Sequence, residues 1–341
     1  MTDGGLTGAM IGCGRIVQEH HIPAWQALGR EAVPRWVLAD TSYENRLRGQ
    51  MAMGVPNEHA YKDYRALLIR ERPDFAVIST PHASHETIAI DCLRAGVPVL
   101  VEKPMAVDLA AARRMVAVAE REGLPLAVIH NYGARPQAQT ARALLEDGAI
   151  GRPFLFRSEG LGIGWSPGAD PDADWRAKAA LSGGGCLLDN GYHGVYMAES
   201  FLGEIVTVYA RVATYNRPID VDDTALLLLT HESGATSSIQ AAWSIAGESR
   251  PVNELYGTEA TMRLEPDGVV AIRRPDRDWE RHPSAPGAGF RRVFRNFLDV
   301  LSGEAAPCAS AEAGLRILRI VRAAYASAER GQPVNVRDFE E

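Results

Sequence analysis

Short apolar runs alternate with helical patterns over the first 130 residues. Five runs are rich in Val, Ile, Leu and Ala, and each is short enough to be a buried strand. These expected strands lie at residues 7–11, 36–40, 75–80, 97–102 and 126–130. Between them, residues 109–121 place Met115, Val116 and Ala119 at helical spacing on one apolar face. Strands that alternate with such helices predict a parallel sheet with crossover connections.

The pattern changes near residue 150. Strand-like runs joined by turns such as E-S-G at 232–234 favour an antiparallel sheet, and they lie at residues 206–214, 225–230 and 236–243. Residues 160–185 are rich in Gly, Pro and Asp, which predicts a loop rather than a linker. Residues 273–289 are polar and carry three prolines, which predicts a solvated loop. One apolar stripe indicates a final helix and consists of Leu315, Leu318, Val321 and Tyr325.

A chain of 341 residues exceeds the size at which one hydrophobic core usually stops growing. The two patterns therefore predict two domains of class α/β and α+β. Residues 1–130 form the first, and residues 131–341 form the second, which is built on a large, mainly antiparallel open sheet. We expect the final helix to be able to pack back toward the first domain.

Composition excludes several classes of protein. Hydrophobic residues make up 46% and charged residues 23%, which is ordinary for a folded enzyme-sized protein. The formal charge of −7 argues against a nucleic-acid partner, because such binding depends on Lys and Arg neutralising phosphates. No stretch approaches the roughly 18 apolar residues of a membrane helix, and residues 1–8 lack a signal-like core, so we expect a cytoplasmic protein.

The four cysteines are scattered singly, without a C-x-x-C pair. This spacing fits neither a disulfide framework nor a zinc site, so we expect reduced and mostly buried thiols. They are Cys13, Cys92, Cys186 and Cys308.

The first expected strand runs into a glycine loop and then a helical pattern. Gly12 permits a tight turn and Gly14 a close approach, so backbone N–H groups near Arg15 and Ile16 could face a pyrophosphate. Val17 stands where a third glycine is usual, and a bare G-x-G also occurs in ordinary turns.

Asp40 ends the second expected strand, 23 residues beyond Val17 (40 − 17). An acid at this place can accept hydrogen bonds from the ribose hydroxyls of a dinucleotide. The alternative is a helix N-cap, for which Asp40, Thr41 and Ser42 are all suited. Strand, loop, helix and acid together predict a dinucleotide-binding Rossmann domain, while pyridine nucleotide and flavin both stay open.

Three further segments resemble the glucose-fructose oxidoreductase, inositol dehydrogenase and rhizopine catabolism family, written Gfo/Idh/MocA. Residues 79–85 read S-T-P-H-A-S-H and match its T-P-x-x-x-H loop. Residues 95–104 read A-G-V-P-V-L-V-E-K-P and match A-G-x-x-V-x-x-E-K-P. Residues 183–193 read G-G-G-C-L-L-D-N-G-Y-H and match G-G-G-x-L-x-D-x-G-x-H. Their order and spacing cover nearly the whole chain.

The resemblance implies a pyridine nucleotide, NAD or NADP, and a sugar or cyclitol-like substrate. It also implies a homodimer or homotetramer assembled through the open sheet. The implied cofactor-binding residues are Gly12, Gly14, Arg15, Ile16, Asp40, Thr80, Pro81, His85, Glu102 and Lys103. The implied substrate residues are Asn131, Tyr132, Trp175, Arg176, Asn190 and Tyr196. The peptide between Lys103 and Pro104 is expected to be cis, as it often is in this family.

The chain departs from the family pattern at three places. Tyr196 stands where an Asp often follows the histidine, and Tyr132 and Gly133 replace an arginine pair. All three lie near the expected substrate residues, so they put the identity of the substrate in question.

Oxidation of a secondary alcohol needs a base for the hydroxyl proton and a nearby positive charge. Lys103 can supply the charge and His193 can be the base. Asp189 lies four residues before His193 in an expected helix, where it can orient the imidazole or bind a substrate hydroxyl. No third ligand accompanies this pair at a useful spacing, so no metal site is expected. The remaining histidines are expected to be structural or solvent-facing, and they are His20, His21, His59, His130, His231 and His282.

These residues favour an NAD(P)-dependent oxidoreductase that moves a hydride between nicotinamide and a secondary alcohol or ketone of a sugar, polyol or cyclitol. Two alternatives stay open. One is an enzyme that oxidises a sugar, eliminates a substituent from a glycoside and reduces the product again without net cofactor turnover. The other is a non-catalytic NAD-sensing protein, which the presence of Lys103, Asp189 and His193 disfavours.

Overall fold

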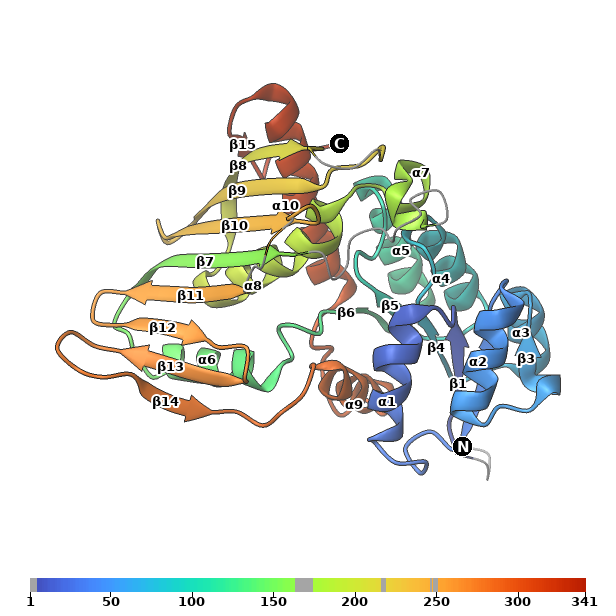
Figure 1. Cartoon of the computed structure of the whole chain (residues 1–341). Coiled ribbons are helices and arrows are strands. Elements are labelled where there is room, and N and C mark those ends of the chain that lie inside the picture. The colour runs from blue at the N-terminus through green and yellow to red at the C-terminus, as the bar shows by residue number, and fades with distance from the viewer. Residues whose placement is uncertain (1–4, 163–173, 216–218, 246, 248–250) are drawn as a thin grey trace. The chain divides into compact units, whose positions relative to one another are not determined.

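The computed structural model of the chain describes residues 5–162, 174–215, 219–245, 247 and 251–341 (Figure 1). These residues form two compact units. The first contains the chain up to Asn131 together with Phe290–Leu315, and the second contains Tyr132–Gly289 and Arg316–Glu341. The division at residue 130 stays a prediction, and residues 290–315 group with the first unit rather than with the rest of the C-terminal region.

The first unit is built on a six-stranded parallel sheet in the order β3-β2-β1-β4-β5-β6. The strands are β1 (Thr7–Ile11), β2 (Arg35–Ala39), β3 (Ala60–Tyr61), β4 (Phe75–Ile78), β5 (Val99–Glu102) and β6 (Leu126–Ile129). All five expected strands are confirmed. The sixth, β3, is only two residues long, which is too short for an apolar pattern to reveal.

Helices connect these strands in the crossover arrangement that the sequence predicts. The predicted helix at 109–121 is confirmed as α5 (Leu109–Glu122), whose Met115, Val116 and Ala119 are buried. The other helices are α1 (Ile22–Gln26), α2 (Tyr43–Met53), α3 (Tyr64–Glu71), α4 (His85–Arg94) and α9 (Phe290–Leu301). A π-helical turn, η1 (Val17–His21), precedes α1, and short 3₁₀ turns lie at η2 (Asn57–His59) and η3 (His82–Ser84).

The strand order reverses between β1 and β4, which are neighbours in the sheet. In open α/β sheets, the loops that leave the carboxyl ends of strands at such a point form the ligand site. Here these loops carry Gly12 after β1 and Ser79 after β4. The Ser79 N–H donates to the Ile11 carbonyl at 2.8 Å, so the two loops start from adjacent positions.

The second unit contains a nine-stranded mixed sheet in the order β14-β13-β12-β11-β7-β10-β9-β8-β15 (Figure 1). Among the described residues of this sheet, only the β7–β10 pair is parallel, and the other pairs are antiparallel, as the sequence predicts. The strands are β7 (Pro153–Leu161), β8 (Ile205–Ala213), β9 (Thr224–His231), β10 (Thr236–Ala242), β11 (Val252–Gly257), β12 (Thr261–Leu264), β13 (Val269–Arg273), β14 (Glu280–Pro283) and β15 (Val334–Asn335).

One face of this sheet is covered and the other is open. Helix α8 (Tyr192–Leu202) packs on the covered face, where a Cβ at Gly194 would lie 2.6 Å from the side chain of Ile239 in β10. On β9, Leu227 and Leu229 are buried while Leu226 and Leu228 point to the exposed face. The remaining helices are α6 (Pro136–Glu146), α7 (Ala179–Ser182) and α10 (Ala311–Arg330), with short turns at η4 (Trp175–Ala177) and η5 (Leu187–Gly191).

Two expected loops are only partly loops. The segment 273–289 contains the exposed edge strand β14, which pairs with β13 although its polar sequence carries no strand pattern. The segment 160–185 begins inside β7 and ends in η4 and α7, and its residues 163–173 lie outside the described part of the chain. The predicted final helix is confirmed as α10, in which Leu318 and Val321 are buried. Among the described residues, no helix is long and apolar enough to cross a membrane.

Candidate active site

The glycine loop after β1 has the geometry that a dinucleotide needs. Gly12 has a φ of 88°, and a Cβ there would lie 2.6 Å from the Ser79 carbonyl oxygen, so glycine is required. A Cβ at Gly14 would meet nothing within 4 Å, which leaves open space where a phosphate could approach the backbone. Beyond it, Arg15 is exposed and Ile16 is half-buried at the start of η1. The loop therefore fits the pyrophosphate of NAD.

Asp40 follows β2 and is bound to the same loop. Its Oδ2 accepts the N–H of Cys13 at 2.7 Å, and its Oδ1 accepts the N–H of Ser42 at 2.8 Å. The N-cap of α2 is Ser42, whose Oγ accepts the Asn45 N–H at 3.3 Å, so the alternative of Asp40 as the cap is wrong. Three of the four cysteines are buried, as expected, and Cys308 is exposed.

The T-P loop and the E-K-P turn are joined by His85. Its Nε2 lies 2.9 Å from the Thr80 carbonyl oxygen and its Nδ1 lies 3.0 Å from the Pro104 carbonyl oxygen. Burial lowers the pKa of this fully buried histidine. The Lys103–Pro104 peptide is cis, as expected. His85 therefore links the two loops, while its direct contact with the cofactor stays a prediction. Pro81 follows Thr80 and is the N-cap residue of η3.

Glu102 has a partner that the sequence does not reveal. The Nε2 atom of His21 lies 2.7 Å from Glu102 Oε1, and Glu102 Oε2 accepts the backbone N–H of Lys103 at 3.0 Å. His21 is fully buried, and its Nδ1 lies 3.3 Å from Ser79 Oγ. Its place in a π-helical turn has no sequence signature, so periodicity could not find this contact. The pair fixes the backbone from which Lys103 projects.

In the second unit, Asp222 organises the glycine run. Its carboxylate accepts the N–H groups of Gly185 at 2.7 Å and Leu187 at 2.8 Å, and the Tyr325 hydroxyl donates to it at 2.7 Å. A Cβ at Gly185 would lie 1.8 Å from the Asp222 carbonyl oxygen, which only glycine avoids. This close approach starts η5, the π-helical turn that carries Asp189.

Asp189 and its neighbours form a polar cluster. The Asp189 Oδ2 atom lies 3.5 Å from Nε of Arg176, whose guanidinium lies 4.3 Å from the centre of the Trp175 ring. The Asn190 side chain accepts the indole N–H of Trp243 at 2.6 Å. Four of the residues predicted for catalysis or substrate binding thus lie on η4 and η5. Asn131, another predicted substrate residue, is buried two residues beyond β6 in the first unit.

His193 lies on the first turn of α8 within a stack of side chains. Its ring stacks on Tyr132 with centroids 4.0 Å apart and an interplanar angle of 10°. The guanidinium of Arg135 lies 3.4 Å from the Tyr132 ring centre. The Nδ1 atom of His193 lies 3.0 Å from the hydroxyl oxygen of Tyr196, which also accepts the Tyr132 N–H at 2.7 Å. Tyr132 and Tyr196, which both depart from the family pattern, therefore both contact the imidazole of His193.

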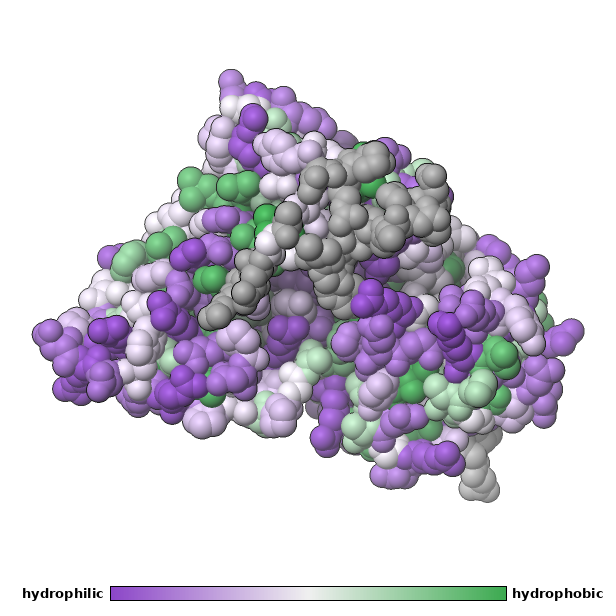
Figure 2. Space-filling model, in the orientation of Figure 1, coloured by the Kyte–Doolittle hydropathy of each residue, from purple (hydrophilic) through white to green (hydrophobic). Residues whose placement is uncertain are grey.

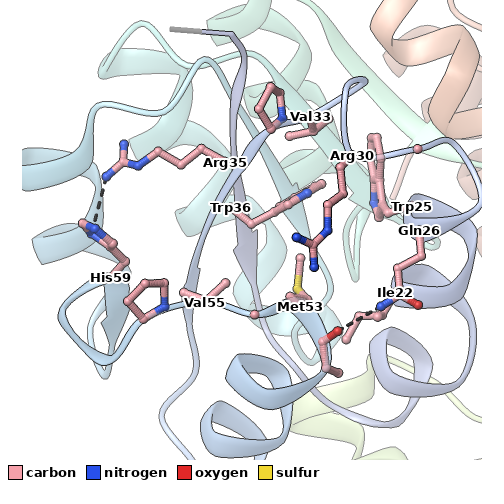
Figure 3. Close-up of a pocket in the computed structure, with 15 residues that line it drawn as sticks. Ile22, Trp25, Gln26, Arg30, Val33, Arg35, Trp36, Met53, Val55 and His59 are labelled. Atoms are coloured by element: carbon pink, nitrogen blue, oxygen red, sulfur yellow. Dashed lines mark hydrogen bonds between the residues drawn. The ribbon is translucent and has the colours of Figure 1, made fainter.

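A cavity of about 360 Å³ lies elsewhere in the first unit (Figure 3). Trp25, Trp36, Arg30 and Met53 line it, and none of the predicted site residues does. Trp36 lies near the start of β2, whereas Asp40 follows the end of that strand. The cavity is therefore separate from the glycine loop.

Comparison with known proteins identifies the family. Residues 6–130 match the model described as "Oxidoreductase family, NAD-binding Rossmann fold", and residues 138–263 match "GFO/IDH/MocA C-terminal domain". D-apiose dehydrogenase from Paraburkholderia graminis is 31% identical over 98% of this chain and 90% of that protein. The chain belongs to the Gfo/Idh/MocA oxidoreductase family. The resemblance seen in its motifs is confirmed, and the protein is an NAD-binding oxidoreductase.

Two further similar proteins support this assignment to the family. Levoglucosan dehydrogenase from Pseudarthrobacter phenanthrenivorans is 27% identical over 80% of this chain and 73% of that protein. An oxidoreductase from Agrobacterium radiobacter, solved with NAD⁺, L-tartaric acid and magnesium, has a TM-score of 0.86 and 26% identity. That comparison covers 97% of this chain and 98% of the other. The fold class of a parallel Rossmann sheet and a mainly antiparallel second sheet is confirmed.

Proposed function

We propose that this Gfo/Idh/MocA protein is a dehydrogenase for a secondary alcohol of a small sugar, with the ketone as product. The single observation that carries the proposal is the group of Asp189, Asn190 and His193. These residues are held on consecutive turns by a buried carboxylate at Asp222. Two side chains able to bind hydroxyl groups thus precede the imidazole by four and three residues on these turns. Relatives named for D-apiose and levoglucosan support a sugar as the substrate.

The geometry of the first unit supports the cofactor residues that we propose. Gly12 and Gly14 would hold the pyrophosphate, Asp40 the adenosine ribose, and Thr80 the loop beside the nicotinamide. When bound, NAD⁺ supplies the acceptor for the hydride that leaves the alcohol carbon. This chain must then supply two things at the alcohol oxygen: a group that takes the proton and a donor that stabilises the charge.

Lys103 and His193 are the two residues that we propose for these roles. Lys103 extends from a turn that His21, Glu102 and His85 hold in place. His193 is fixed by Tyr132 and Tyr196. Asp189 is paired with Arg176, so it is suited to accept a substrate hydroxyl while its charge is balanced.

A panel of D-apiose, levoglucosan and myo-inositol with NAD⁺ tests this function. We expect an increase in nicotinamide absorbance with at least one of these sugars, and a smaller kcat/KM for simple aliphatic secondary alcohols. Absence of net NADH formation over sugars and polyols, with NADH binding intact, would overturn the proposal.

We also propose a homo-oligomer assembled through the open face of the nine-stranded sheet. Leu226 and Leu228 on β9 are 48% and 51% exposed, and Tyr209 on the neighbouring β8 is 38% exposed. Figure 2 shows hydrophobic residues gathered over this part of the sheet. Contiguous apolar surface of this kind marks protein interfaces. Light scattering should give a mass of two or four chains, and Leu226→Lys with Leu228→Lys should reduce it. A monomeric wild-type protein would contradict this.

A further inference from the structure

The cavity of about 360 Å³ in the first unit takes no part in the proposed reaction (Figure 3). Cavities that bind small ligands usually measure about 300 to 1,000 Å³. This one lies at the amino end of β2, where Trp36 lines it, whereas Asp40 follows the carboxyl end of that strand. The extended chain between these two residues spans roughly 13 Å. A ligand in the cavity would therefore leave the glycine loop free for the cofactor.

Two tryptophans form an apolar wall of the cavity. Trp25 of α1 stacks on Phe294 of α9, with ring centroids 4.4 Å apart and an interplanar angle of 6°. Trp36 of β2 lies 5.0 Å from the Trp25 ring centre at an angle of 64°. Beside them, Gln26 Nε2 donates to the Ala52 carbonyl oxygen at 2.9 Å and joins α1 to α2 (Figure 3). Because contacts within the unit hold this wall, little ordering is needed when a ligand binds.

The indole N–H of Trp25 is a buried donor without an acceptor. The residue is 5% exposed, and its Nε1 has no hydrogen-bond partner among the described residues. Buried donors in folded proteins nearly always have a partner. An acceptor that is not part of this chain would satisfy this donor, which favours a ligand that carries an oxygen atom.

The charged groups at the cavity are basic. The described residues that line it include Arg30, Arg35 and His59 but no Asp or Glu, although the chain has a formal charge of −7. Arg35 and His59 both contact the carboxylate of Glu71, which balances the charge of Arg35. Arg30 is exposed and forms no hydrogen bond or ion pair within the described part of the chain. Figure 3 shows its side chain extending between the two tryptophans. Its guanidinium is therefore available to an anion.

We propose that this cavity binds a small carboxylate with an aromatic body. The two indoles can pack against the ring of such a ligand, and the planar guanidinium of Arg30 can donate to both carboxylate oxygens. An inorganic anion would leave the apolar wall without a partner, and a neutral aromatic compound would leave Arg30 without one. The wall and the charge therefore select together for an apolar monoanion. This site is distinct from the proposed dehydrogenase site and does not depend on its reaction.

Indole N–H signals of protein with ¹⁵N-labelled tryptophan test the site directly. The chain has six tryptophans, and the signals of Trp25 and Trp36 are assigned by their loss in Trp25→Phe and Trp36→Phe. The ligands are phenylacetate, its neutral isostere phenylacetamide, and acetate as the anion without a ring. We expect phenylacetate to shift both signals saturably with a Kd below about 1 mM, while the signal of Trp243 in the second unit stays unchanged. Phenylacetamide and acetate should bind at least about fivefold more weakly.

Three exposed residues supply the variants. Arg30→Gln should weaken phenylacetate binding by about fivefold or more, because it removes the cation. Arg94→Gln is the matched control, since it removes an exposed arginine of α4 that does not line the cavity. The carboxylate of Glu31 lies beside Gly29, a lining residue, so Glu31→Gln should strengthen the binding of an anion. Calorimetry with the same ligands gives the Kd of each variant without signal assignment.

NADH distinguishes this site from the cofactor site. Saturation with NADH should change the Kd for phenylacetate by less than about twofold, because the two ligands bind at opposite ends of β2. Absence of shifts at about 10 mM phenylacetate, equal binding of phenylacetamide, an unchanged Kd in Arg30→Gln, or displacement by NADH would each overturn the proposal. Because the titration needs no sugar substrate, lack of turnover would defeat the proposed function without affecting this site.

Discussion

Asp40 Oδ2 accepts the backbone N–H of Cys13 at 2.7 Å, which ties the end of β2 to the glycine loop. The carboxylate therefore stays beside the place proposed for the adenosine ribose. A 2′-phosphate there would meet a negative charge. Arg46 donates to the Asp40 carbonyl oxygen at 2.7 Å, so its guanidinium is engaged beside the same residue.

We expect NAD to be preferred over NADP by at least about 100-fold in kcat/KM, or about 2.7 kcal/mol. Asp40→Ser should narrow this ratio, because it removes the charge while keeping a hydroxyl for hydrogen bonding. Steady-state kinetics with both cofactors measures the ratio. Comparable values for NAD and NADP in the wild type would show that Asp40 does not set the preference.

Substitution of the two glycines of the loop should have different effects on stability and on NADH binding. Gly12→Ala forces a Cβ into the Ser79 carbonyl at a positive φ, so it should lower the free energy of unfolding by about 1 to 3 kcal/mol. Gly14→Ala meets no atom within 4 Å, so stability should change by less than about 0.5 kcal/mol. Its methyl group should nevertheless weaken NADH binding by about tenfold or more, equal to about 1.4 kcal/mol.

Urea unfolding and NADH fluorescence titration separate these effects. The pair is its own control, because the two substitutions are chemically identical and two residues apart. Unchanged NADH affinity in a folded Gly14→Ala protein would mean that the pyrophosphate does not approach the loop.

Sequence patterns predict the first unit better than the second for a physical reason. Strands β4 and β5 are buried on both faces and therefore read as continuous apolar runs. The edge strand β14 is exposed and polar, so only its pairing with β13 defines it. Strand β7 pairs in parallel with β10, and local patterning does not reveal such a distant partner.

Sequence patterns predict the candidate site only in part as well. Lys103, Asp189 and His193 lie within recognisable motifs and could be named from the sequence. The contact of His21 with Glu102 depends on a π-helical turn and joins residues 81 positions apart. The contact of the Tyr132 N–H with the Tyr196 oxygen joins residues 64 positions apart. The resemblance marks Tyr196 and Tyr132 as substrate residues and as departures from the family pattern, but it does not indicate that they contact each other. The contact of both side chains with the imidazole of His193 depends on the tertiary structure.

Acid should destabilise the protein through two buried histidines. Burial lowers the pKa of His85 and His231 from the usual 6.5. The folded state therefore binds fewer protons than the unfolded state below pH 6.5, so stability is full above that value and falls as the pH drops. Glu199 has the opposite sign, because burial raises its pKa above the usual 4.5. Its contribution to stability grows as the pH falls from the raised pKa toward 4.5, so it opposes the effect of the histidines.

Urea midpoints measured from about pH 7.5 to about pH 5.5 test this dependence. Each histidine can contribute at most about 1.4 kcal/mol per pH unit. His231→Gln should flatten the slope even though it lowers stability at neutral pH. A wild-type midpoint that is constant or rises toward acid would contradict the prediction.

The proposed division of labour gives the final prediction. Lys103→Ala and His193→Ala should each lower kcat by about 10² to 10⁴, or roughly 3 to 5 kcal/mol, while the Kd for NADH stays nearly unchanged. The cofactor is held by Gly12, Gly14 and Asp40, so neither substitution removes its main contacts.

In the same measurements, Asp189→Asn distinguishes binding of a substrate hydroxyl by Asp189 from orientation of the His193 imidazole. If Asp189 binds a substrate hydroxyl, the variant should raise KM for the sugar and should add to His193→Ala. If it only orients the imidazole, the double substitution should fall well short of additive, because groups that act as a unit cannot each be lost twice. Circular dichroism and the NADH titration establish that each variant is folded. Retention of more than about a tenth of wild-type turnover in both alanine variants would remove Lys103 and His193 from the chemical step.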